Sequence, residues 1–384
     1  MNYLNYEEEY LKRYGGYQTA MEISRQPDVW LKTFRKLHEE SKSIDKFLRN
    51  AFKEVDNIVL TGAGSSSFIG NSVADIMYAQ LNIITRVIPT THIVTFPELY
   101  FNPSRSTLII SFARSGDSPE SIASLELADR YSKKCFHLII TCNESGELAH
   151  FQSKNPSMVF VLPEEANDEG LAMTCSYTSM LMTALFITFL NEREIFNEQF
   201  ELSINVAQKL LSDQLTNLET IAKKNFTRAV FLGSGPLFGT AMEASLKLQE
   251  LTNGRVICKA DSFLGFRHGP KVIVNEDTLV VYFFSNNKYA SQYEIDLVNS
   301  MQHALYQIGI GEKVINEIQI DKQIILSSGS KPIHKYFQSL SYIIPGQLIG
   351  FFKSMQLGIK PDTPSLNGAI SRVVQGVNIY PIET

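Results

Sequence analysis

Residues 57–67 read N-I-V-L-T-G-A-G-S-S-S, and this stretch indicates the class of fold. Residues 57–60 have the short, largely apolar pattern of a strand that is covered on both faces. Two glycines then make a loop, and a helix is expected from about Phe68. A buried strand, a glycine loop and a helix in this order are typical of a parallel α/β sheet.

The same order recurs along the chain. Further strands of the first half are expected at 84–88, 107–111, 136–141 and 159–162. A connecting helix over 198–224 leads to a second glycine loop, L-G-S-G-P at 232–236. Strands of the second half are expected at 228–231, 256–259, 278–284, 314–318 and 324–326. The spacing of the two glycine loops is too long for a solenoid and fits a duplicated α/β domain.

The predicted fold class is therefore α/β, with two tandem parallel-sheet domains, each a three-layer α/β/α arrangement. Residues 1–50 have helical apolar spacing and are expected to form an N-terminal extension. The first sheet domain is expected over 51–195. The second, with a linker helix and a proline-rich C-terminal tail, is expected over 196–384.

Composition narrows the function classes. The 384 residues are 44% hydrophobic and 20% charged, as in globular proteins with full cores. The net charge is −5 and no long basic block occurs, so nucleic acid is not an expected ligand. No apolar run is long enough for a membrane span. The four cysteines lack zinc spacing, and the polar N-terminus is unlike a signal peptide, so we expect free thiols, no metal and a cytoplasmic protein.

Two serine-rich loops are the first candidate site. Ser65 and Ser66 follow one predicted strand, and Ser115 and Ser118 follow a neighbouring one. Each loop precedes a helix, whose free N–H groups and positive end can bind an anion such as phosphate. Serine also caps helices, which is the competing interpretation. Two such loops at one sheet edge favour phosphate, although neither a P-loop nor a Rossmann fingerprint is present.

A carboxylate and an imidazole in the second half are the other candidates. L-K-L-Q-E at 246–250 is helical and is followed by Asn253-Gly254, which predicts a helix end. Glu250 therefore lies in the last turn, where the helix dipole disfavours its charge. His268 lies in the irregular segment G-F-R-H-G-P at 265–270. The two side chains are a possible acid–base pair, although each could also be an ordinary exposed residue.

Taken in order, these motifs resemble the sugar isomerase (SIS) domain family over roughly residues 50–384. The tandem arrangement is similar to the isomerase half of glucosamine-6-phosphate synthase. L-A-M-T-C-S at 171–176, P-D-x-P-S at 361–365 and R-V-V-Q-G-V at 372–377 resemble a narrower family. That family comprises the galactosamine/tagatose-6-phosphate aldose–ketose isomerases, also described as galactosamine-6-phosphate deaminases.

The resemblance implies roles for individual residues. It implies that Glu250 moves a proton between C1 and C2 of the sugar, that His268 opens the ring, and that Lys247 lies near the substrate. In the synthase the matching histidine reaches across a dimer interface, so a homodimer is expected, with no organic cofactor. The resemblance implies that phosphate is bound by Ser65, Ser66, Arg114, Ser115, Gly116 and Ser118.

The chain departs from the synthase in two places. The synthase has a lysine near its C-terminus that forms a Schiff base, whereas no lysine follows Lys360 here. Arg372 is the nearest cation, and a guanidinium cannot form an imine. The separation of Glu250 and His268 is also slightly longer than in the synthase, so the loop between them must differ.

The expected function is conversion of D-galactosamine 6-phosphate to D-tagatose 6-phosphate and ammonia. A glutaminase domain and an N-terminal cysteine are absent, so amination with ammonia from glutamine is not expected. A tagatose-6-phosphate aldose–ketose isomerase, a glucosamine-6-phosphate deaminase and a non-enzymatic sugar-phosphate sensor remain as alternatives. Glu250 and the acidic pI of about 5.9 favour an enzyme over a sensor.

Overall fold

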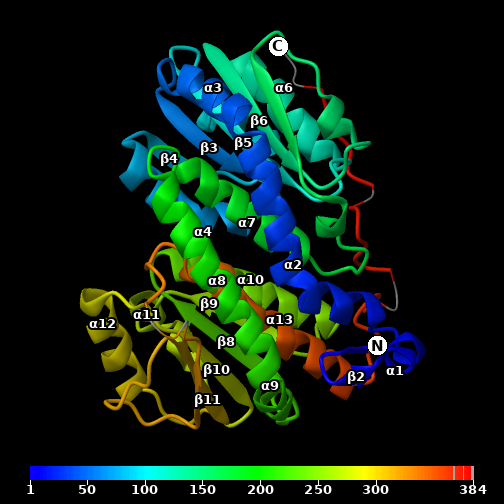
Figure 1. The fold of residues 1–384 in the computed structure, drawn as a ribbon, viewed down its shortest axis with the longest axis vertical. Coiled ribbons are helices and arrows are strands. Elements are labelled where there is room, and N and C mark those ends of the chain that lie inside the picture. The colour runs from blue at the N-terminus through cyan, green and yellow to red at the C-terminus, as the bar shows by residue number, and fades with distance from the viewer. Residues whose placement is uncertain (328, 330, 366–367, 375, 382–384) are drawn as a thin grey trace. The chain divides into compact units, whose positions relative to one another are not determined.

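The computed structural model describes residues 1–327, 329, 331–365, 368–374 and 376–381. The chain forms two compact units, each with one five-stranded sheet (Figure 1). The first-sheet unit comprises Asp28–Asp168, Cys175–Asn191 and the tail from Ile370. The second-sheet unit comprises Met1–Pro27, Glu169–Thr174 and Glu192–Ala369.

The first sheet is entirely parallel and has the order β4-β3-β5-β6-β7. Its strands are β3 (Asn57–Thr61), β4 (Ile84–Val87), β5 (Ser106–Ala113), β6 (Lys134–Thr141) and β7 (Ser157–Val161). The predicted strands of the first half are thus confirmed. Because β4 and β5 flank β3 on opposite sides, the carboxyl ends of β3 and β5 meet at a topological switch point, where open α/β sheets bind ligands.

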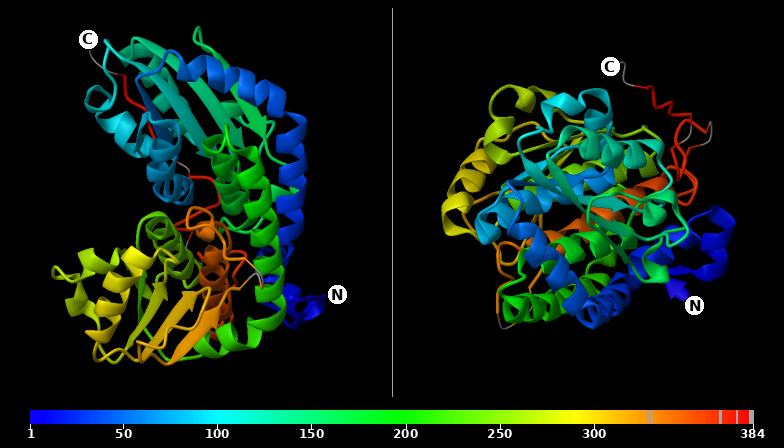
Figure 2. Two further views of the ribbon diagram at one scale, coloured as in Figure 1. Left: turned by 60° about the vertical axis from the view of Figure 1, so that its left-hand side comes forward. Right: turned by 90° about the horizontal axis from the view of Figure 1, so that it is seen from above.

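Helices cover both faces of this sheet (Figures 1 and 2). On one face Val59 and Ile109 pack in a cluster with residues of α5 (Thr90–Thr95) and α6 (Pro119–Tyr131). On the other face lie α4 (Ser65–Leu81) and α7 (Cys175–Thr188), which pack on each other. A Cβ on Gly70 of α4 would stand 2.8 Å from Val87, so this glycine allows α4 to lie close against the sheet.

The second sheet is also entirely parallel and has the order β12-β11-β10-β8-β9. Its strands are β8 (Arg228–Gly233), β9 (Ile257–Asp261), β10 (Thr278–Phe283), β11 (Tyr306–Gly311) and β12 (Lys322–Ile325). The pattern of crossovers is the same as in the first sheet. The prediction of a duplicated parallel α/β fold is therefore confirmed.

Four helices pack around the second sheet. A cluster on one face joins Val230 and Tyr282 to residues of α11 (Phe263–Phe266) and α12 (Lys288–Asn299). The other two helices, α10 (Pro236–Leu251) and α13 (Gln338–Gln356), pack tightly on each other. A Cβ on Gly346 would lie 2.5 Å from the Ala244 side chain, so the helix contact depends on this glycine.

Two predicted elements are wrong. The strand expected at 314–318 is a loop, and the strand lies earlier, at Tyr306–Gly311. Glycine weakens a strand pattern, but Gly309 is needed here because its Cβ would meet the Phe284 ring at 2.7 Å and Ile320 at 2.9 Å. The single helix expected over 198–224 is two helices, α8 (Arg193–Asp213) and α9 (Leu215–Ala222).

The N-terminal residues are mainly helical. A short hairpin of β1 (Asn2–Tyr3) and β2 (Tyr6–Glu7) precedes α1 (Glu8–Tyr14), α2 (Tyr17–Glu39) and α3 (Ser41–Phe52). Because α2 is divided between the two units, a separate N-terminal extension and the boundaries 1–50, 51–195 and 196–384 stay predictions. None of the helices among the described residues combines the length and apolar character needed to cross a bilayer.

Candidate functional site

The first serine loop is a tight strand-to-helix turn. Gly64 has φ 56° and ψ −126°, and α4 begins at the next residue, Ser65. A Cβ on Gly62 would lie 2.6 Å from the Ser66 side chain, so the turn needs a residue without a side chain there. Ser65 and Ser66 are each 5% exposed. The first turn of α4, with Ser65 and Ser66, therefore lies at the carboxyl end of β3.

The second serine loop lies at the same edge. Thr61 of β3 pairs with Ser111 of β5, which brings the loops that follow these strands side by side. Gly116 has φ 73°, a conformation that glycine adopts without strain. Ser118 is the N-cap residue of α6, but its side chain makes no capping hydrogen bond. The competing interpretation, helix capping by serine, is thus not what Ser118 does.

The second loop is held by the loop that follows β6. The Asn143 amide donates to the carbonyl oxygen of Ser115 at 2.9 Å. The backbone N–H of Glu147 donates to Asp117 at 3.1 Å, and the N–H of Asp117 donates to the Ser115 hydroxyl at 3.3 Å. These bonds fix the loop before any ligand arrives. The structure thus brings the six predicted phosphate-binding residues to one edge of one sheet.

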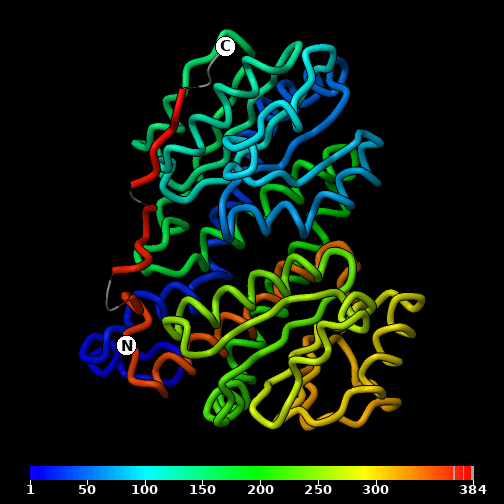
Figure 3. The backbone as a smooth tube through the Cα atoms, turned by 180° about the vertical axis from the view of Figure 1, so that it is seen from behind, coloured from blue at the N-terminus to red at the C-terminus, as the bar shows by residue number. Residues whose placement is uncertain are grey.

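Arg114 connects this edge to the C-terminal tail. Its side chain is 7% exposed, and Nη2 donates to the carbonyl oxygen of Arg372 at 2.8 Å. Figure 3 shows the C-terminal segment, in red, along the first-sheet unit to which it belongs. From the sequence, Arg372 was only the cation nearest to the missing lysine. Its contact with Arg114 could not be predicted because the two residues are far apart in the chain.

Glu250, Lys247 and Glu243 lie on one face of α10. Lys247 is 1% exposed, and its Nζ lies 2.7 Å from Glu250 Oε2 and 3.3 Å from Glu243 Oε1. The spacing E-x-x-x-K-x-x-E aligns the three side chains along a helix. Glu250 is in the last turn, as predicted, and its side chain is 23% exposed. Glu243 was missed, although this spacing is visible in the sequence.

His268 lies outside the helix that carries Glu250. It follows α11 and precedes a 3₁₀ turn at Pro270–Ile273, and its side chain is exposed. Its backbone N–H donates to Gly265 at 3.0 Å. In the described part of the chain, no hydrogen bond or ion pair joins His268 to Glu250. The single chain therefore does not form the predicted pair by itself.

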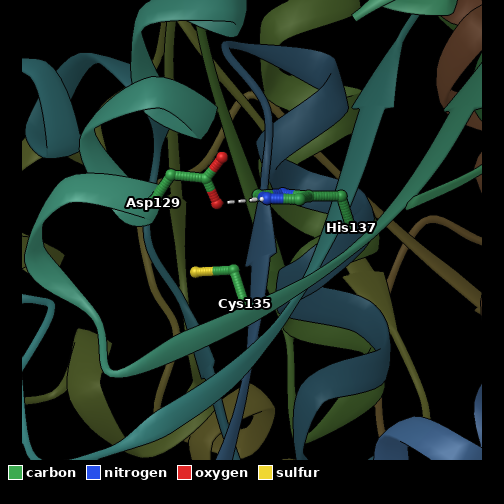
Figure 4. A group of neighbouring side chains, drawn as sticks. All are labelled: Asp129, Cys135 and His137. Atoms are coloured by element: carbon green, nitrogen blue, oxygen red, sulfur yellow. Dashed lines mark hydrogen bonds and ion pairs between the residues drawn. The ribbon is translucent and has the colours of Figure 1, made fainter. Parts of the chain in front are cut away.

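One further group of polar side chains was not predicted. Asp129 at the end of α6 lies beside Cys135 and His137 of β6, with the three ligand atoms within 4.8 Å of one another (Figure 4). Cysteine and histidine two residues apart point to one face of a strand, which is not a familiar metal-binding spacing. The Asp129 carboxylate comes close to these two side chains only in the folded structure.

Hydrogen bonds account for this group. Asp129 is bonded to His137 at 2.7 Å, to Ser153 at 2.5 Å and to Asn155 at 2.7 Å. Burial raises the pKa of the Asp129 carboxyl, but these hydrogen bonds outweigh it and lower the pKa below its usual value. Burial raises the pKa of the Cys135 thiol to about 12, which disfavours the thiolate that binds metals. The cluster thus fastens the loop around Ser153 to α6 and β6.

The fold and the site together define a class. Two parallel α/β halves with one crossover pattern, and serine loops at the carboxyl edge of the first sheet, describe a duplicated α/β protein with hydroxyl side chains at one sheet edge. The family model described as "SIS domain" matches residues 51–189. A D-galactosamine-6-phosphate deaminase of Shewanella sp. (strain ANA-3) is 36% identical over 97% of this chain and 94% of its own length. The chain therefore belongs to the SIS domain family.

Solved structures agree over the whole chain. A protein from Clostridium novyi NT shares 40% identity with a TM-score of 0.95, and each chain is fully covered. A tagatose-6-phosphate ketose/aldose isomerase from Escherichia coli shares 34% identity with a TM-score of 0.87, again over both full chains. The resemblance stated from the sequence motifs, including the narrower family, is confirmed.

Proposed function

We propose that this protein is a D-galactosamine-6-phosphate deaminase that produces D-tagatose 6-phosphate and ammonia. The proposal is carried by one observation: two serine loops and a buried arginine occupy one sheet edge in a chain whose full-length relative is a deaminase of that name. A sugar phosphate fits such an edge because helix N-termini, hydroxyls and a guanidinium all favour a phosphate dianion.

In this proposal the phosphate is held by the two serine loops. Ser65 and Ser66 donate from the first turn of α4, and Ser115 and Ser118 donate from the loop after β5. Gly116 offers a backbone N–H without a side chain in the way. The charge comes from Arg114 in the same loop, as the resemblance implied.

The proposed chemistry is a proton transfer followed by hydrolysis. His268 opens the sugar ring to the aldehyde. Glu250 then removes the proton from C2, giving an enolamine, and returns a proton to C1, giving an alcohol at C1 and an imine at C2. Water adds to C2 and ammonia leaves, which yields the ketose phosphate. Lys247 holds Glu250 through the 2.7 Å ion pair and needs no covalent bond to the substrate.

The test is ammonia release by purified protein from galactosamine 6-phosphate and from glucosamine 6-phosphate, each at equal concentration. Ammonia from the galactosamine ester, with tagatose 6-phosphate in equal amount, supports the proposal. The second candidate function is a tagatose-6-phosphate isomerase, which the name of the E. coli structure favours. Interconversion of tagatose 6-phosphate with an aldose, without ammonia from either amino sugar, would establish that alternative. Binding without turnover would indicate a sensor.

We also propose a cytoplasmic homodimer in which His268 acts in the partner's site. His268 is exposed, and no hydrogen bond or ion pair joins it to Glu250 within the described chain, which supports this arrangement. Glu250→Ala and His268→Ala proteins, each inactive alone, should regain part of the activity when their subunits exchange. Mass spectrometry monitors the exchange of subunits. If the subunits exchange and no activity returns, His268 serves its own chain. Cell fractionation tests the location.

A further inference from the structure

Arg372 connects the C-terminal tail to the loop that precedes α7. Arg372 donates from Nε to the carbonyl oxygen of Asp168 at 2.7 Å and from Nη2 to the Asn167 side chain at 2.5 Å. Ile370 and Val374 on either side are 41% and 51% exposed. The guanidinium therefore holds this part of the tail against residues 167 and 168.

The anchor to which Arg372 binds is rigid. The Asp168 carboxylate is fully buried and accepts backbone N–H groups of Cys175 at 3.0 Å and Ser176 at 2.9 Å. It also accepts the Ser176 hydroxyl at 2.5 Å. These bonds satisfy the N-terminus of α7, so Asp168 is tied to the first residues of a buried helix. Arg372 is thus positioned relative to the core of the unit.

Arg372 in turn holds Arg114. Its backbone carbonyl accepts Nη2 of Arg114, a residue in the loop that follows β5. A guanidinium carries its five N–H donors in one plane, so a bond to one nitrogen fixes the directions of the others. The carbonyl also consumes none of the positive charge. Arg114 can therefore be oriented by the tail and still act on an anion.

Both guanidiniums lie near the end of β6. Burial raises the pKa of the Cys142 thiol and the Asp168 charge raises it further, whereas the charges of Arg114 and Arg372 lower it. The backbone N–H of Cys142, the residue that directly follows β6, donates to the carbonyl oxygen of Ala113 at 3.2 Å, next to Arg114. The Asp168 carboxylate is already engaged with the start of α7. Two positive groups therefore lie beside the serine loops.

We propose that Arg372 is a positioning residue of the phosphate site, acting through Arg114. The ligand class is a phosphate monoester dianion, recognised apart from the sugar ring. The inference rests on the proposed function, because it takes the serine loops and Arg114 as the phosphate site. It adds a residue that the SIS resemblance did not assign.

The test compares Arg372→Ala and Arg372→Lys with Arg114→Ala and with the double variant. Ser371→Ala serves as the matched control, because its exposed hydroxyl donates to the Val373 carbonyl. The measurements are KM and kcat for the amino sugar phosphate and the competitive Ki of inorganic phosphate. Circular dichroism and melting temperature show that each variant is folded. Arg372→Lys keeps the charge and serves if Arg372→Ala does not fold.

Loss of one oriented charge-assisted hydrogen bond should raise KM and the phosphate Ki about tenfold in Arg372→Ala, with kcat within about threefold. Arg372→Lys should recover only part of this loss, because an ammonium cannot hold both partners in one plane. The double variant should have the same phosphate Ki as Arg114→Ala alone, because Arg372 acts through Arg114.

Three outcomes would overturn the proposal or its basis. If Arg114→Ala weakens phosphate binding and neither Arg372 variant does, the positioning role is wrong and the proposed function stands. If the effects of the two arginines multiply, Arg372 acts independently of Arg114, which also contradicts the proposal. If none of the four variants changes the phosphate Ki, the assignment of the phosphate site itself is wrong.

Discussion

The two sheets of this protein have one scaffold and two different edges. In each, the first strand lies between the second and the third, and all strands are parallel. The glycine loops match closely: Gly64 has φ 56° and ψ −126°, and Gly235 has φ 55° and ψ −128°. Backbone geometry alone would thus allow an anion site at either edge.

The side chains at matching positions of the two edges differ. Where the first loop continues with Ser65 and Ser66, the second continues with Pro236 and Leu237, and Leu237 is buried. Thr61 pairs with Ser111 as Leu232 pairs with Tyr282. Counted from these pairs, Ser285 takes the place of Arg114. At the matching positions the second edge therefore lacks the Arg114 cation and the hydroxyls of Ser65 and Ser66, although it has serines of its own, Ser234 and Ser285.

The second edge has carboxyl groups instead. Glu294 of α12 is fully buried and accepts the N–H of Ser285 at 3.0 Å. Burial raises the pKa of Glu294 to about 7, and burial also raises the pKa of Glu312, just after β11, to about 7. An acidic edge repels a phosphate dianion. Two scaffolds with the same strand order thus differ in the charge at their strand ends, and in the proposed mechanism the second half supplies Glu250 and Lys247 of α10.

The largest expected effect separates chemistry from binding. Glu250→Gln keeps the size of the side chain but removes the basic oxygen, so kcat should fall by roughly 10²–10⁴, the usual contribution of a positioned general base. The Ki of inorganic phosphate should stay unchanged, because the phosphate candidates lie on the first sheet. Steady-state kinetics and inhibition by phosphate measure both quantities.

The control is Glu276→Gln, at an exposed position of the same unit. If Glu250→Gln keeps more than about a tenth of the wild-type kcat, another residue is the base. A large rise in the phosphate Ki would contradict the proposal that the first half binds the phosphate while the second half supplies the base.

A smaller effect is expected at the first edge. Ser115→Ala and Ser118→Ala each remove one hydroxyl donor, so KM should rise by about three- to tenfold while kcat changes less, since phosphate binding is largely uniform. Ser104→Ala, in an exposed turn of the same unit, is the control. An unchanged KM in both variants would mean that these two hydroxyls do not bind the phosphate.

The smallest effect concerns stability at the second edge. The folded pKa of Glu294, about 7, lies above its ordinary value of 4.5, so the folded state binds more protons between these values. Wild-type stability should therefore fall as pH rises from 4.5 to 7 and level off above it. The Glu294→Gln protein does not undergo this loss. The unfolding free energy of the variant minus that of wild type should therefore be roughly 2 kcal/mol larger at pH 8 than at pH 5, since each pKa unit corresponds to about 1.36 kcal/mol.

Urea denaturation at the two pH values measures the difference in unfolding free energy. Glu317→Gln, at an exposed position, controls for the loss of one negative charge. Glu312 and Tyr342 remain in both proteins, so their titration cancels in the comparison. A stability difference that does not change with pH would show that Glu294 is ionised throughout this range.

The sequence by itself determined the fold class and most of the elements. Short apolar strands such as 57–60, bounded by glycine loops, can only be covered on both faces, and this requires a parallel sheet. The glycines marked both strand-to-helix turns because a side chain at Gly62 would collide with Ser66. Local signals sufficed wherever the cause was local: the end of α10 near Glu250 and the serines of both loops were all predicted.

Only the tertiary structure decided features that depend on distant residues. β11 includes Gly309 because the Phe284 ring lies over it, which no pattern around residue 309 reveals. The contact of Arg114 with Arg372 joins a loop to the tail. The cluster of Asp129, Cys135 and His137 requires a helix end beside a strand. Side-chain contacts and burial arise from chain segments brought together by folding, whereas periodicity and turn chemistry are written in neighbouring residues.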